Sequence, residues 1–356
     1  MQVVAFALGS FILALTFWDL FETVVVPRPT PGWFRIGRYV VRGSWRGLRA
    51  LHDGRPGRSY DRVLGLFAPA ATMALLATWL VALILGYGLV LYALRDELRP
   101  VPPNLGSALY FAATSVLTLG FGDIVAVDAP ARIIVAMGAI SGLGVVALVV
   151  TFLFSLYGSY QRREVEVVAL QAAAGAPPSA VALLETYAQL DLVERLPALF
   201  LEWERWAVVV LDSHVAYPLL AFFRSSHDNL SWISALGTVL DAASLVLTTI
   251  DGVPRGEAKL FKRVGTHLVE DIYNLGFRAG EATNLDRSSF DAACDRLEEA
   301  GFKLLPRDEV WPRFEAARAT YALRLEAMAR YLATPATSWL GDPVALRSPL
   351  HAQDDP

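Results

Sequence analysis

The chain is poor in cysteine, and its first 158 residues contain no lysine. Cys294 is the single cysteine, which excludes an intrachain disulfide and a cysteine-rich metal site. His214, His227 and His267 and their acidic neighbours follow no metal-ligand spacing, and no nucleophile is paired with a base. We therefore expect neither a disulfide nor a metal centre of these kinds, and we expect that the chain is not an enzyme.

Charged residues are absent from two long stretches. Residues 64–92 and 133–157 contain no Asp, Glu, Lys or Arg, and each exceeds the roughly 20 residues that cross a bilayer. Both are predicted to be membrane-spanning helices. Residues 3–26 are apolar apart from Asp19 and Glu22, whose cost is smaller near a helix end than at its centre, so we interpret them as a third span. A cleaved signal peptide would need basic residues before this stretch, and none precede it.

Charge is distributed unevenly along the chain. Residues 1–158 hold 12 Arg against 8 acidic residues, whereas the remainder holds 19 basic and 27 acidic residues. Nine of those arginines fall within residues 28–62, and the positive-inside rule places this loop in the cytoplasm. The N-terminus is then outside, and everything after residue 160 is cytoplasmic. We expect a multi-pass protein of the plasma or inner membrane.

The arginine-rich loop is predicted to form a basic amphipathic helix at the inner membrane surface. Its arginines are spaced three or four residues apart, which puts them along one helical face toward anionic lipid phosphates. The alternatives are a voltage-sensing helix and a helix packed on the cytoplasmic part. Glycines in the loop and the absence of sheltering spans disfavour a voltage sensor. The arginines concerned are Arg35, Arg38, Arg42, Arg46 and Arg49.

A short helix and a glycine-alternating segment lie between the two uncharged stretches. Asn104 follows two prolines and is a good N-cap, and a helix over residues 105–116 is too short to span, so it would be re-entrant. Non-helical backbone survives at membrane depth only where it lines water or is buried in protein. Carbonyls that replace the hydration shell of a cation need alternating unusual backbone angles, and therefore glycine at every second residue. The segment with this spacing is Thr118-Leu119-Gly120-Phe121-Gly122-Asp123.

These six residues are the candidate ion site. The ligands would be the carbonyls of Thr118, Leu119, Gly120 and Phe121, with the Thr118 hydroxyl closing the innermost site and Asp123 at the outer mouth. The C-terminal end of the short helix would direct about half a negative charge toward the cavity below, which favours a cation there. The segment therefore predicts a cation-selective filter.

Residues 108–123 resemble the pore helix and signature of the potassium-channel family, commonly written T-V-G-Y-G-D. Leu119 stands for the usual valine, and Phe121 stands for the usual tyrosine and lacks its hydroxyl. The resemblance covers about residues 64–160. It implies K+ as the permeant ion, and Tyr110 and Phe111 as an aromatic cuff around the filter. The residues that match the signature are Thr118, Gly120, Gly122 and Asp123.

The resemblance also implies an assembly and a gate. One filter strand cannot surround an ion, so four copies should form a closed homotetramer. The inner helix would line the cavity, and Gly138, Gly142 and Gly144 lie where such a helix could bend. Small residues that allow close helix packing are the alternative reading of these glycines. Both readings stay open on the sequence.

The part after residue 160 is predicted to be helical throughout. Residues 231–250 are apolar enough for a fourth span, but Asp241 at their centre favours a buried helix of a bundle. This part shows no glycine-rich phosphate loop, so we expect no organic cofactor. Its sequence does not identify the ligand that would gate the channel.

The predicted architecture is an all-α membrane protein: a pore-loop channel module with a re-entrant pore helix and filter, plus an α-helical cytoplasmic domain. It comprises an N-terminal span (1–27), a basic interfacial linker helix (28–62), a pore module (63–160), a helical cytoplasmic domain (161–335) and a flexible tail (336–356). Within the module we expect an outer helix (64–94), a pore helix (105–116), a filter (118–123) and an inner helix (131–158).

The sequence favours passive K+ conduction, gated by the cytoplasmic domain, with the bilayer and identical subunits as partners and no nucleic acid. A weakly selective cation channel is one alternative. A membrane-anchored sensor or scaffold with a vestigial pore is another. An enzymatic cytoplasmic domain is a third, without a visible catalytic constellation.

Overall fold

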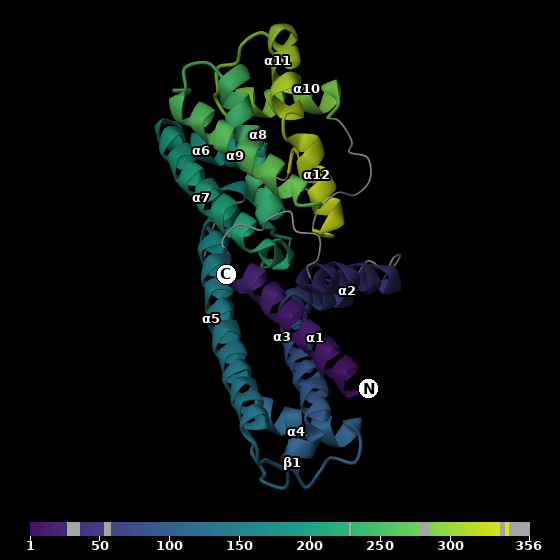
Figure 1. The fold of residues 1–356 in the computed structure, drawn as a ribbon. Helices are drawn as coiled ribbons and strands as arrows, with labels where there is room; N and C mark the ends of the chain where they lie inside the picture. Colours follow the sequence, from purple (N-terminus) through teal and green to yellow (C-terminus); the bar gives the residue numbers. More distant parts are fainter. Residues whose placement is uncertain (27–35, 53–57, 228, 278–284, 335–338, 342–356) are drawn as a thin grey trace, which may run out of the picture. The chain divides into compact units, whose positions relative to one another are not determined.

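The computed structural model describes residues 1–26, 36–52, 58–227, 229–277, 285–334 and 339–341. The chain divides into two compact units, unit 1 (Met1–Tyr157) and unit 2 (Gly158–Pro356), whose elements are labelled in Figure 1. Regular structure in the described residues is almost entirely helical. The protein is an all-α, multi-pass membrane protein, as predicted. The helices long and apolar enough to cross a membrane contain Gln2–Val24, Arg62–Ala93 and Ala129–Ala174.

Unit 1 consists of long helices and one re-entrant segment. Two short strands, which the sequence reading missed, pair antiparallel beside that segment, with Leu98 opposite Ala126. The elements are α1 (Gln2–Leu20) with a π-helical turn (Phe21–Val25), α2 (Ile36–His52), α3 (Arg58–Ala93), a 3-10 turn (Arg95–Glu97), β1 (Leu98–Arg99), α4 (Leu105–Val116), β2 (Val125–Ala126) and α5 (Ala129–Ala174).

Helix α1 packs on α3 through glycines. A Cβ atom on Gly9 would lie 2.6 Å from the Gly86 carbonyl oxygen, so only glycine permits this approach. The buried Asp19 carboxylate accepts a hydrogen bond from Trp79 Nε1 at 2.8 Å. The free-energy cost of burying the Asp19 carboxylate in an apolar helix is therefore offset by a hydrogen-bond donor from the neighbouring helix.

Two helices extend beyond their predicted bounds. The outer helix α3 begins at Arg58 rather than at residue 64, and α5 continues to Ala174 rather than ending at 158. The continuation has a simple cause, because residues 159–174 contain neither glycine nor proline. Gly175 then adopts a φ of +81°, which is the usual left-handed end of a helix. Residues of α5 after Tyr157 belong to unit 2.

Unit 2 is a bundle of helices around α8. All residues of α8 from Trp232 to Val246 are buried, and the helix starts at a capping box between Ser231 and Ser234. With 17 residues, all of them from Trp232 to Val246 covered by the same chain, α8 is a core helix rather than a fourth span. Besides α8 (Trp232–Thr248), the helices of unit 2 are α6 (Ala180–Gln189), α7 (Leu196–Ala216), α9 (Gly256–Asn274), α10 (Arg287–Glu299), α11 (Arg307–Ala319) and α12 (Ala322–Tyr331), with 3-10 turns η3 (Val193–Arg195) and η4 (Pro218–Phe222).

The buried Asp241 of α8 is fully engaged inside unit 2. Its Oδ1 accepts hydrogen bonds from Tyr321 Oη at 2.6 Å and Arg318 Nε at 3.2 Å. A buried carboxylate with a cation and a phenol as donors needs no water. The polar residue that argued against a membrane span is thus neutralised by α11 and by Tyr321, which precedes α12.

Residues 339–341, which belong to the predicted flexible tail, form hydrogen bonds with unit 2. Ser179 Oγ donates to the Leu340 carbonyl at 2.8 Å, and Trp339 Nε1 donates to the Ser289 carbonyl at 3.1 Å. Residues 339–341 are therefore held on unit 2 by contacts with residues distant in sequence. The rest of residues 336–356 lies outside the described residues.

Candidate functional site

Helix α4 covers the range predicted for the short helix and is held by glycines on both neighbours. Asn104 Oδ1 accepts from Ser107 N at 3.0 Å and so caps the helix start. A Cβ atom on Gly88 of α3 would lie 2.5 Å from Leu109 Cδ2, and one on Gly142 of α5 would lie 1.8 Å from the Val116 carbonyl oxygen. The end of α4 is thereby fixed against α5.

The segment after α4 has alternating backbone conformations. The angle φ is +56° at Thr118, +56° at Gly120 and +81° at Gly122, whereas Leu119 and Phe121 between them are not left-handed. Such alternation turns successive carbonyl groups toward one side, which an ordinary strand cannot do. Glycine takes this conformation freely, but a β-branched Thr118 takes it only under strain of about 1–3 kcal/mol.

Hydrogen bonds hold the inner end of this segment on α4. The Leu119 N–H donates to the Thr114 carbonyl at 2.7 Å, and the Thr118 N–H donates to the Ser115 carbonyl at 3.0 Å. These are carbonyls at the end of a helix, which lack partners within it. The last turn of α4 therefore sets the position of the alternating segment.

The other side of the alternating segment is not covered by the described part of the chain. Leu119 is 55% and Phe121 66% exposed, and no atom lies within 4 Å of a Cβ built on Gly120 or Gly122. Large exposed apolar side chains of this kind mark a surface that another molecule covers.

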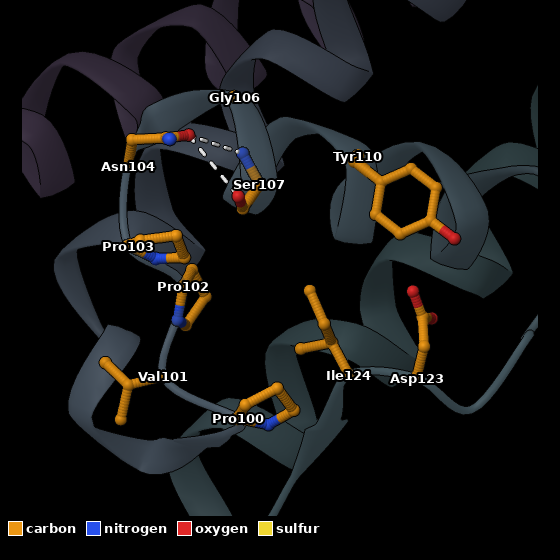
Figure 2. Close-up of a pocket in the computed structure, with 10 residues that line it drawn as sticks. All are labelled: Pro100, Val101, Pro102, Pro103, Asn104, Gly106, Ser107, Tyr110, Asp123 and Ile124. Atoms are coloured by element: carbon orange, nitrogen blue, oxygen red, sulfur yellow. Dashed lines mark hydrogen bonds between the residues drawn. The ribbon is translucent and has the colours of Figure 1, made fainter.

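Asp123 lies at the other end of the segment, beside an open cavity. The cavity measures about 510 Å³ and is walled by Pro100, Pro102 and Ile124, among others. Tyr110 also lines this cavity, and Figure 2 shows its hydroxyl and the Asp123 carboxylate pointing toward one another. The sequence placed Tyr110 in an aromatic cuff and gave no sign of this approach, which brings α4 close to the end of the segment.

The three glycines of the predicted hinge have different surroundings. Gly142 contacts the end of α4. A Cβ atom built on Gly138 would meet Tyr87 and Val116 at ordinary van der Waals distance, and one built on Gly144 would meet no other part of the described chain within 4 Å. The adjacent Ser141 hydroxyl is 2.7 Å from the Tyr87 hydroxyl of α3. Close packing against α4 explains why position 142 is a glycine. At Gly144 no neighbouring element restricts bending of α5.

Helix α2 has a buried aromatic side chain beside an exposed basic one. Trp45 is 2% exposed and meets the Phe67 ring of α3 at 4.7 Å, while Arg46 is exposed. Arg42 and Arg49 are half-buried. Of the arginines predicted to contact lipid, Arg35 lies outside the described residues, and nothing is described of the Arg38 side chain.

The remaining candidates do not form a second site of the kinds considered. Among the described residues no group of three or more His, Cys, Asp or Glu could hold a metal ion. His214 is buried in unit 2, whereas His267 is exposed and lies 3.5 Å from Asp271. The alternating segment is thus the strongest candidate site in the described part of the chain.

Comparison with known proteins gives one match. Neither a curated protein nor a solved structure matches the chain. The model of a family described as "Ion channel" matches residues 67–158, about a quarter of the chain. This range contains most of α3, all of α4, the alternating segment and the first part of α5. Residues 67–158 are therefore similar to an ion-channel family, and the match supports an ion-channel pore module in this part of the chain.

Proposed function

We propose that the chain is one subunit of a homotetrameric, K+-selective channel that conducts passively across the membrane. The observation that carries the proposal is the left-handed alternation at Thr118, Gly120 and Gly122 directly after a capped, re-entrant helix. Successive carbonyl groups on one side of an extended backbone at membrane depth are the arrangement that coordinates a permeating cation, and few other functions need it. The similarity of residues 67–158 to an ion-channel family supports the same function.

Potassium is the transported ion in this proposal. The carbonyl oxygens of Thr118, Leu119, Gly120 and Phe121 replace its hydration shell, and the Thr118 hydroxyl closes the innermost site. Leu119 and Phe121 contribute only backbone oxygens, so the departures from the usual signature remove no ligand. Asp123 keeps its carboxylate at the outer mouth, where it raises the local concentration of cations.

The homotetramer is inferred from exposed apolar surface. Among the exposed residues of α5 is a series of large apolar ones spaced three or four positions apart, which forms a stripe along the helix. Lipid can cover such a stripe, but not the polar backbone beside the exposed Leu119 and Phe121, which needs protein or a water-filled cavity around it. Four copies around one axis provide it and close the ring of carbonyls. The stripe contains Ile133, Met137, Ile140, Leu143, Val146, Val150, Phe154 and Tyr157.

The proposed orientation follows from charge. The arginines of residues 28–62 are retained in the cytoplasm, with anionic lipids at Arg35, Arg38, Arg42, Arg46 and Arg49. Gln2 Nε2 donates to Asp96 Oδ2 at 3.2 Å, so the start of α1 and the end of α3 lie on one side. That side is the outside in this proposal, and unit 2 is cytoplasmic.

The lipid contact is tested with a peptide that has the sequence of α2. Replacing Arg42, Arg46 and Arg49 by Gln should weaken binding of this peptide to phosphatidylserine vesicles in a flotation assay.

Gating is assigned to the movement of α5 by unit 2. The candidate hinge remains Gly138, Gly142 and Gly144, and a bend at Gly144 is the least hindered because nothing lies within 4 Å of it. Gly142 is packed against Val116, so a bend there would move the end of the pore helix as well.

The test is the reversal potential of purified protein in planar bilayers under opposing K+ and Na+ gradients. We expect a reversal near the K+ equilibrium potential. Gly120→Ala should abolish the current, because alanine disfavours the φ of +56° at this position. Gly65→Ala is the matched control, because Gly65 lies in α3 with no neighbour within 4 Å.

The outcomes separate the alternatives. A reversal near zero would support a weakly selective cation channel instead. Absence of current from an intact tetramer, at neutral and at acidic pH, would contradict conduction and favour a sensor or scaffold with a vestigial pore.

A further inference from the structure

A fully buried arginine lies on the part of α5 that belongs to unit 2. Arg163 is 1% exposed, and all five of its N–H groups have acceptors. Nε and one N–H of Nη2 donate to Glu164 Oε1, and the other N–H of Nη2 donates to the Phe223 carbonyl at 2.7 Å. Nη1 donates to the Leu220 carbonyl at 2.9 Å and to His214 Nε2 at 3.0 Å. We call Arg163, Glu164 and His214 the Arg163 junction.

The junction fixes the protonation state of His214. A guanidinium can only donate, so Nε2 of His214 must accept and carries no proton. The other nitrogen, Nδ1, lies 2.9 Å from the Val210 carbonyl, which can only accept, so Nδ1 carries the proton. His214 is therefore neutral with its proton on Nδ1. Its ring packs on Trp232 of α8 at 5.1 Å.

A second proton on this ring would break the junction. It would have to go on Nε2, which removes the acceptor of one Arg163 N–H and sets two cations 3.0 Å apart. The groups that face the pair are Tyr160, Arg163 and Glu164 from α5 and the Trp232 ring from α8, while η4 offers backbone carbonyls. Glu164 already balances Arg163, so the added charge would be uncompensated. Burial and the Arg163 charge accordingly hold the pKa of His214 well below its ordinary value.

We propose that the Arg163 junction is a proton-sensitive coupling between unit 2 and the inner helix: protonation of His214 detaches the end of α5 from α7 and η4. Arg163 and His214 act here as positioning residues, because neither touches the ion. The proposal rests on the proposed function in one respect, namely that α5 is the inner helix of a pore and unit 2 faces the cytoplasm.

The junction itself is tested by hydrogen exchange on the full-length tetramer in detergent, at about pH 7.5 and about pH 4.5. After correction for intrinsic rates, peptides covering residues 159–166 and 217–224 should exchange at least about fivefold faster at the lower pH. Peptides from α10 and α11, which contribute no group to the junction, serve as the internal reference for general acid unfolding. His214→Gln should remove the difference, because its amide oxygen accepts from Arg163 and does not titrate in this range.

His267→Gln is the matched control, because His267 is exposed on α9 and outside the junction; it should leave the pH difference unchanged. Equal protection at both pH values in the unmodified protein overturns the proposal, as does the same acid response in His214→Gln. Arg163→Lys, which keeps the charge but not the five donors, should raise exchange of the same peptides already at about pH 7.5.

Coupling is tested by the open probability in bilayers as the pH on the unit 2 side is lowered. We expect a change of at least about fivefold in the unmodified protein and in His267→Gln, and none in His214→Gln. Exchange that responds to acid without a change in open probability overturns the coupling. Absence of current under all conditions contradicts the proposed function, while the exchange experiment still decides whether the junction responds to protons.

Discussion

Helices α5 and α8 are both strongly apolar, yet their surroundings differ. On the unit 1 part of α5, Ile140 is 72% and Phe154 76% exposed, whereas every residue of α8 from Trp232 to Val246 is buried within the same chain. Unit 2 thus completes its core alone. Unit 1 leaves one side of its most apolar helix exposed, and lipid and further copies of the chain cover that side in our proposal.

The two units also differ in the groups that donate hydrogen bonds to a buried carboxylate. Asp19 in unit 1 has Trp79 as its donor, with the backbone N–H of Gly37 at 3.5 Å, and both are uncharged. Asp241 in unit 2 is held by the Arg318 guanidinium and the Tyr321 hydroxyl. A neutral donor suffices near the end of an apolar helix, whereas a carboxylate at the centre of a bundle is paired with a cation.

The largest effect is expected where unit 1 packs most tightly. Gly142→Ala would place a Cβ atom 1.8 Å from the Val116 carbonyl oxygen, so α4 or α5 has to move. We expect at least about a tenfold loss of intact tetramer on size-exclusion chromatography and no residual current. Gly144→Ala, two residues away, should assemble normally because a Cβ atom there meets nothing within 4 Å. Equal assembly of the two variants would refute this account of the α4–α5 contact.

Removal of the buried ion pair should produce the next largest effect, confined to unit 2. Asp241→Ala leaves Arg318 only the more distant Glu326 carboxylate at 3.7 Å, which is expected to destabilise unit 2 by about 3 kcal/mol. Urea unfolding of the full chain in detergent measures this change. Asp212→Ala removes an exposed carboxylate on α7 and should shift the midpoint little. Similar midpoints for both variants would show that the buried pair contributes no special stability.

Acidification should lower the stability of unit 2 through His214. The pKa of His214 is well below its ordinary value of 6.5, so the unfolded state takes up a proton that the folded state does not. The free energy of unfolding therefore falls as the pH drops below 6.5, by up to about 1.4 kcal/mol per pH unit for this group. His214→Gln should reduce the slope by that amount in urea unfolding at several pH values. An unchanged slope would mean that the histidine does not stay neutral in the fold.

The smallest disturbance of the protein is expected from labelling of Cys294, which reports on the packing of unit 2. Burial raises the pKa of its thiol to about 11, so only about one molecule in a thousand carries a thiolate at pH 8. Iodoacetamide should label the native chain very slowly and the urea-unfolded chain at least about a hundredfold faster. Cys294→Ser measures background labelling. Rapid labelling of the native protein would contradict the burial of α10 against its neighbours.

Local signals were sufficient for several elements. Asn104 after two prolines defines the start of α4, and the glycines at 120 and 122 occupy two of the left-handed positions. The uncharged stretches correspond to parts of α3 and α5. Capping, hydrophobic length and glycine spacing each act over a few neighbouring residues, and such features can be read without the fold.

Contacts between distant residues could not be read in this way. Asp19 and Trp79 are separated by 60 positions, and Arg163 and His214 by 51. Tyr110 seemed only a bulky aromatic residue until the fold brought it to Asp123. The left-handed Thr118 was not anticipated either, because nothing in a threonine favours that conformation.

The sequence by itself determined that the chain is helical, that three segments can cross a membrane, and that a glycine-alternating segment follows a short helix between two of them. These properties depend on the period, length and spacing of residue types along the chain. The tertiary structure alone decided that α8 is a core helix, that the end of α4 packs against Gly142, and that Arg163 forms a hydrogen bond with His214. Burial and pairing depend on which surfaces meet, and that information lies in residues far apart in the sequence.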